Sequence, residues 1–72
     1  MSIHEIQALT IRALQNMRGD DTARAKLAFR NHTPAQMREQ YGQSGKTCQQ
    51  ILNEYMEHDR KIDEAIAWVR GQ

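Results

Sequence analysis

The sequence predicts an all-α fold, a small bundle of three to four helices that ends in a long C-terminal helix. Residue pairs at the spacing of helix caps recur along the chain, and apolar residues recur at intervals of three and four. Glycine and proline fall mainly between these periodic segments, where helices begin and end. At 72 residues the chain has room for a single helical domain, which we expect to span residues 1–72.

The first helix is expected over residues 3–18. Ser2 and Glu5 have the spacing of a capping box, so the helix should begin directly after Ser2. Arg18 followed by Gly19 is typical of a helix end, because a cation suits the negative end of a helix and glycine readily adopts a left-handed turn. The apolar residues of this segment share one face at helical spacing: Ile3, Ile6, Leu9, Ala13, Leu14 and Met17.

The second helix is expected over residues 21–31, with Asp20 or Asp21 as its cap. If the first two helices were one continuous helix, Asp20, Asp21 and Arg24 would interrupt its apolar stripe. We therefore expect a break or a kink near Gly19.

The third helix is expected over residues 34–41. Thr33 and Gln36 have capping-box spacing, and Pro34 stands at the first helical position, where its missing amide hydrogen costs nothing. Gly42 should end this helix and open a glycine-containing loop.

The last helix, expected over residues 47–70, has the strongest periodicity in the chain. Seven of its residues alternate in steps of three and four and form a seam: Cys48, Ile51, Tyr55, His58, Ile62, Ala65 and Val69. The seam either pairs with a second copy of the chain or packs on the chain's own first helix. A domain of this size hides only about 60% of the surface of its unfolded chain, so we favour a helix-mediated homodimer with this dimer seam.

Composition excludes several classes of protein. A net charge of +1 excludes a strongly basic nucleic-acid-binding protein, although basic residues outnumber acidic ones in residues 1–46 and the reverse holds in residues 47–72. Cys48 is the only cysteine, so no disulfide can form within the chain. No apolar run approaches the roughly 20 residues that cross a bilayer, and we expect a cytoplasmic protein with no membrane contact.

No pattern indicates an enzyme. His4, His32 and His58 lie far apart in the sequence, and no carboxylate or serine stands at a spacing that suggests a triad or a metal site. Cys48 is interpreted as a small core residue, because no histidine is placed to activate it. We therefore expect no catalytic residues, no cofactor and no metal.

Residues 34–53 resemble the helix-turn-helix of DNA-binding regulators. When Gly42 is set on the turn, four residues fall at positions that are apolar in that motif: Met37, Tyr41, Cys48 and Ile51. The resemblance implies that five side chains face the major groove of duplex DNA: Ser44, Lys46, Thr47, Gln49 and Gln50. A compact DNA-binding transcriptional regulator is thus the alternative function.

The chain as a whole resembles, by its size, its compact caps and its lack of catalytic motifs, the small helical accessory proteins that bacteriophages encode to modulate host proteins. The resemblance implies a non-enzymatic protein-binding modulator that inhibits or redirects a host factor in the host cytoplasm. Exposed apolar, aromatic and basic residues are typical of such contact surfaces. The residues expected to bind the protein partner are Arg30, Met37, Arg38, Tyr41, Met56 and Trp68.

Overall fold

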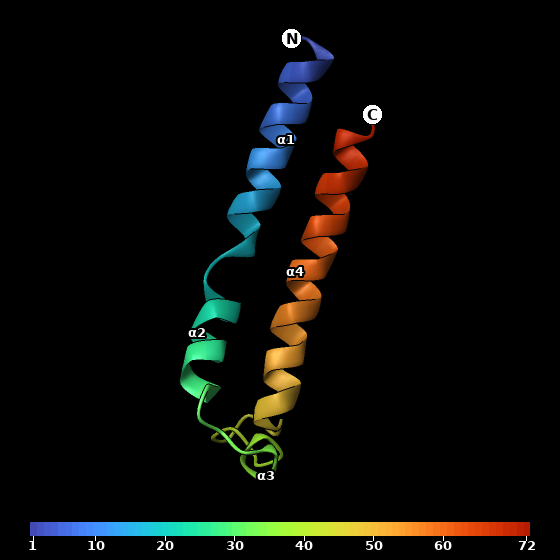
Figure 1. The fold of residues 1–72 in the computed structure, drawn as a ribbon. Coiled ribbons are helices and arrows are strands. Elements are labelled where there is room, and N and C mark those ends of the chain that lie inside the picture. Colours follow the sequence, from blue (N-terminus) through green and yellow to red (C-terminus); the bar gives the residue numbers. More distant parts are fainter.

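The computed structural model describes residues 1–72 as an all-α hairpin of two antiparallel arms (Figure 1). Helices α1 (Ile3–Arg18) and α2 (Asp21–Phe29) form one arm, and α4 (Cys48–Arg70) forms the other. The single-turn helix α3 (Pro34–Met37) lies where the chain reverses, which we call the loop end; both termini lie at the opposite, open end. The hairpin measures 51 × 21 × 16 Å. The predicted all-α class is confirmed.

Three of the four predicted caps make their hydrogen bonds, whereas Asp20 stands at the N-cap of α2 without a side-chain capping bond. The hydroxyl of Ser2 accepts a hydrogen bond from the backbone amide of Glu5. Thr33 with Gln36, and Thr47 with Gln50, form complete capping boxes in which each side chain satisfies the other residue's amide. Between α1 and α2 the chain breaks at Gly19, whose φ of 62° is a conformation that glycine adopts at little cost.

Two helices end earlier than the sequence predicts. The second ends at Phe29 rather than at residue 31, because the amide of His32 donates to the carbonyl of Phe29 and closes a tighter turn. The third ends at Met37 rather than at residue 41. Just beyond it the amide of Cys48 donates to the carbonyl of Glu39 at 3.0 Å, and the amide of Tyr41 donates to the carbonyl of Lys46 at 2.8 Å. Residues 39–41 therefore pair with the segment before α4 instead of continuing the helix.

The buried side chains form two groups. Near the loop end, Ala25, Phe29 and Cys48 are buried together, and Met37 and Leu52 pack against them. Towards the open end α4 alone contributes the buried side chains, which are Ile62, Ile66 and Val69. On α1 no residue is fully buried, and the half-buried positions are Gln7, Ile11 and Leu14. The side-chain amide of Gln7 donates to the carbonyl of Val69 at 3.1 Å and joins the two helices there.

The line of α4 residues that faces the other arm differs in part from the predicted seam. Cys48, Ile62 and Val69 of the seam are buried within the chain, and Ile51 and Ala65 are half-buried. Tyr55 and His58 are exposed, whereas Leu52, Asp59 and Ile66 are covered to varying degrees instead. Two heptad lines share the positions of Cys48, Tyr55, Ile62 and Val69, and the hairpin uses the line that adds Leu52, Asp59 and Ile66.

The chain exposes more surface than a compact protein of its mass. Its accessible area is 5692 Å², whereas a compact monomer of 8.4 kDa exposes about 4,600 Å². The radius of gyration is 16.2 Å, against about 11 Å for a compact domain of this length. None of the helices, α4 included, is both long and apolar enough to span a lipid bilayer.

Candidate protein-binding surface

A hollow lies between α2 and the start of α4, and the loop after α3 closes one side of it. It encloses about 250 Å³ and is mostly apolar. We call it the aromatic groove, and its lining residues are Asp21, Arg24, Ala25, Ala28, Phe29, Tyr41, Ile51 and Tyr55. Residues far apart in the sequence meet here only because the hairpin brings α2 and the first turns of α4 side by side.

Three aromatic rings give the groove its shape. Phe29 is buried, and the ring of Tyr41 stands edge-on against it with the centroids 5.6 Å apart. The backbone holds Tyr41 in place, because its amide donates to the carbonyl of Lys46 at 2.8 Å. Tyr55 is 37% exposed and Tyr41 is 50% exposed. Neither tyrosine hydroxyl makes a hydrogen bond within the chain, so both remain available to a partner.

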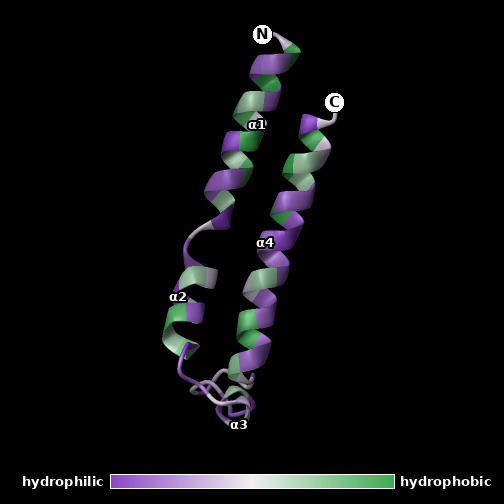
Figure 2. Cartoon of the chain, viewed as in Figure 1, coloured by the Kyte–Doolittle hydropathy of each residue, from purple (hydrophilic) through white to green (hydrophobic).

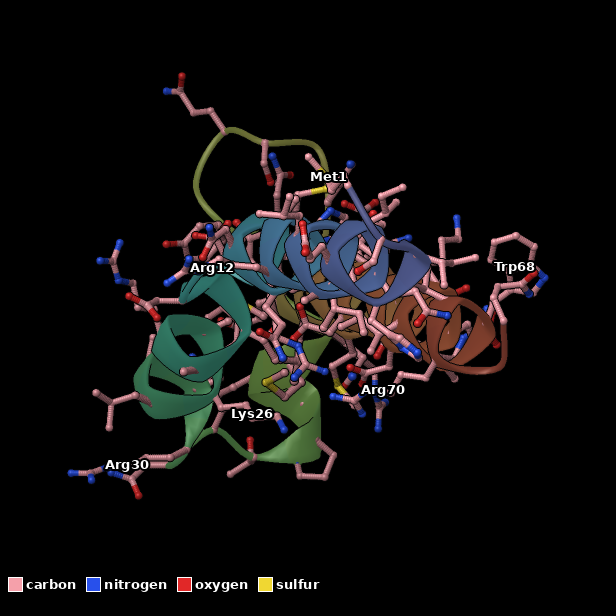
Figure 3. The ribbon with its side chains drawn as sticks, turned by 90° about the horizontal axis from the view of Figure 1, so that it is seen from above. Met1, Arg12, Lys26, Arg30, Trp68 and Arg70 are labelled. Carbon is pink, nitrogen blue, oxygen red and sulfur yellow. The ribbon has the colours of Figure 1, made fainter.

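The exposed cations divide into paired and unpaired groups. Arg18 pairs with Asp63, Lys46 with Glu54, Arg60 with Glu57 and Glu64, and Arg24 loosely with Asp20. Six other cations form no ion pair: Arg12, Lys26, Arg30, Arg38, Lys61 and Arg70. Three of them, Arg12, Lys26 and Arg30, lie on the side of the hairpin away from Trp68 (Figure 3). We call this the basic side.

The residues predicted to bind a protein partner do not form one surface. Tyr41 lines the aromatic groove, and Met37 is half-buried against the loop-end core. Arg30 lies on the basic side, whereas Trp68 is 68% exposed near the open end on the opposite side. Met56, one turn after Leu52, and Arg38, just beyond α3, are both exposed.

Sequence reasoning did not assign Phe29, Arg24 or Tyr55 to a partner-binding site. Tyr55 was assigned to the dimer seam, and Phe29 and Arg24 were assigned to no site. Nothing local in the sequence indicates that Tyr41 meets Phe29, because the loop that joins them folds by long-range backbone hydrogen bonds.

The residues of the helix-turn-helix resemblance have partners within the chain. Thr47 and Gln50 form the capping box of α4, and Gln49 donates to Asn53 at 2.8 Å. The ammonium group of Lys46 lies 2.8 Å from a carboxylate oxygen of Glu54, and Ser44 donates to the carbonyl of Tyr41. Residues 38–47 separate α3 from α4, a longer connection than the roughly three or four residues of that motif.

Neither the histidines nor the cysteine belongs to a cluster of metal-binding side chains, and the ring of His32 stands edge-on against Phe29 with the centroids 5.2 Å apart. No three side chains of the metal-binding types lie close enough together to hold an ion. Cys48 is 5% exposed and belongs to the loop-end core. Comparison with known proteins adds no assignment, because the chain matches no protein family, no curated protein and no solved structure.

Proposed function

We propose that this chain is a non-enzymatic protein-binding module that modulates its partner by occupying part of the partner's surface. The aromatic groove is the centre of the binding surface. The observation that carries the proposal is the groove itself, in which two partly exposed tyrosines with free hydroxyls flank the buried Phe29.

Such a groove suits an apolar anchor from a partner. Its volume of about 250 Å³ has room for a large apolar side chain. Tyrosine and arginine dominate the energetics of protein interfaces, because they bury a large area and still offer a polar group at the rim. Tyr41, Tyr55 and Arg24 provide those groups around Ile51 and the alanines of α2.

The unpaired cations near the groove favour a partner that carries acidic residues beside its apolar anchor side chain. Lys26 belongs to α2, the helix that forms one wall of the groove, and Arg30 directly follows that helix. Neither forms an ion pair within the chain. Their charge steers an acidic surface towards the loop end, chiefly through the rate of association. A phage-type modulator that inhibits or redirects a host factor would use a surface of this kind.

The proposal is tested by affinity capture of the tagged chain from cell lysate, with quantification of each recovered protein. Tyr55→Ser and Tyr41→Ala should each lose the recovered partner. Leu27→Ala is the matched control, because Leu27 is an exposed apolar residue of α2 outside the groove. Recovery of the same partner with both tyrosine variants would contradict the assignment of the groove.

The DNA-binding alternative is tested on the same protein. Steeply salt-dependent binding of duplex DNA that is lost in Lys46→Ala and Gln49→Ala would replace the present proposal. Because both side chains already have partners within the chain, we expect no such binding.

A further inference from the structure

A stripe of exposed residues runs along α1, on a different face from the residues that pack on α4. Its five members alternate in steps of three and four: Ile3, Ile6, Thr10, Ala13 and Met17. All five are exposed, and Ile3, Ile6 and Met17 are 62%, 50% and 60% exposed. We call them the outer stripe. The helix therefore carries two heptad lines, and the hairpin covers only the line that includes Ile11 and Leu14.

We propose that the outer stripe is the contact surface between two copies of this chain. The surface lies on α1, outside the aromatic groove, so the inference is independent of the proposed function. A twofold axis would apply the stripe of one copy to the stripe of the other, as in most soluble homodimers.

The exposed area agrees with the needs of a dimer. The chain exposes about 1,100 Å² more than a compact monomer of its mass, and a stable interface covers about 800 Å² on each partner. An interface of that size along α1 would remove most of this excess. It would also cover a second face of α1, which has no fully buried residue in the single chain.

The chemistry of the outer stripe allows it to be buried against itself. None of its members is charged, so self-pairing leaves no unpaired charge in the interface. Thr10 is its only polar member, and its hydroxyl donates to the carbonyl of Ile6 at 2.7 Å. Because that hydroxyl is satisfied within the helix, only its methyl group needs to be buried. Ala13 is small, which lets two helices approach closely.

The other faces of the hairpin are less suited to self-pairing. The middle of α4 is largely hydrophilic, whereas hydrophobic residues recur along α1 (Figure 2). The exposed line of α4 there contains Glu54, His58 and Lys61, which an apolar stripe would leave without hydration. Pairing the basic side with its own copy would bring Lys26 and Arg30 against like charges. Contact of α1 with α1 is therefore the arrangement in which apolar surface meets apolar surface.

The test measures mass against concentration by sedimentation equilibrium of the full chain. The wild-type chain should reach twice its 8.4 kDa mass within the micromolar range. Ala13→Glu places a charge in the contact and should raise the dimer dissociation constant at least about 100-fold. Ala8→Glu is the matched control, since Ala8 is an exposed alanine of the same helix outside the stripe, and it should leave the dissociation constant unchanged.

A second variant controls for the possibility that Ala13→Glu loses the dimer only because the chain unfolds. Thr10→Val keeps the shape of the side chain and removes the hydroxyl, so it should tighten the dimer several-fold while the circular dichroism stays helical. A wild-type chain that remains a monomer at every concentration overturns the proposal, as does equal loss of the dimer in Ala13→Glu and Ala8→Glu, or an unchanged dimer in Thr10→Val. Tyr55→Ser should keep the dimer mass. A failure of the groove proposal can therefore be distinguished from a failure of the outer-stripe proposal.

Discussion

The two ends of the hairpin are held together in different ways. At the loop end α2, α3 and α4 surround one cluster, in which Phe29 and Cys48 are buried and Met37 covers them from α3. At the open end only α1 and α4 meet, and all the buried side chains belong to α4. Two packed helices always leave their outer faces in water, and a third element is needed to enclose a core. The loop end has that third element within the chain, and the open end lacks it.

The largest expected effect on the free energy of unfolding comes from alanine substitutions in the two buried groups. Phe29→Ala should cost about 3–5 kcal/mol of the free energy of unfolding, and Ile66→Ala about 2–3 kcal/mol, because the thinner open end can relax around the lost atoms. Chains of this size are stabilised by roughly 4–11 kcal/mol in total. Phe29→Ala should therefore remove the larger share of this stability, and Ile66→Ala the smaller share.

Urea denaturation followed by circular dichroism measures both values, with Leu27→Ala as the control for an exposed apolar residue. A larger loss for Ile66→Ala than for Phe29→Ala would mean that the open end is the better-packed half of the molecule.

Gly19 joins the two regions, and substitution there should have an intermediate effect. Its φ of 62° and ψ of −164° lie in a region that is almost reserved for glycine. An added β-carbon would meet no atom within 4 Å, so the cost of Gly19→Ala is backbone strain alone. We expect a loss of about 1–3 kcal/mol in the free energy of unfolding. Gly71→Ala, at a glycine with negative φ, should change it far less, and equal losses would contradict this reasoning.

The sequence predicted the helix starts because their causes are local. Ser2, Thr33 and Thr47 each bond to an amide three residues away, so residue type and spacing are enough to identify them. The end of α3 was missed because its cause is not local. The carbonyl of Glu39 accepts from the amide of Cys48, and no periodicity along the chain encodes that contact.

The face that α4 turns inward could not be chosen from spacing alone. The two heptad lines differ only in the choice between neighbours, such as His58 and Asp59, and the hairpin half-covers Asp59 while His58 is exposed. A carboxylate is a poor core residue, so neither spacing nor residue type indicates that Asp59 is the half-covered neighbour. The aromatic groove could not be predicted from the sequence either. It forms where Tyr41 meets Phe29 across the reversal of the chain, a contact that no local pattern encodes.

The smallest effect on stability is expected from substituting Arg60 in the middle of α4, between the two buried groups. There Arg60 bridges Glu57 and Glu64 on the exposed surface. The hydrogen bond from Arg60 lowers the pKa of the Glu57 carboxyl below its ordinary value of 4.5. The partial desolvation of the carboxyl opposes this shift, and the charges of Arg60 and Lys61 reinforce it.

A carboxyl whose pKa is lowered by folding stabilises the folded state above its ordinary pKa, and this contribution is lost as the pH falls through the lowered value. In Arg60→Gln the pKa of Glu57 should rise towards 4.5, which an NMR titration of its side-chain carboxyl measures. The thermal midpoint at neutral pH should hardly change, because ion pairs in water contribute little. A large fall in the midpoint would contradict this expectation and show that the ion pairs along α4 contribute substantially to the stability of the chain.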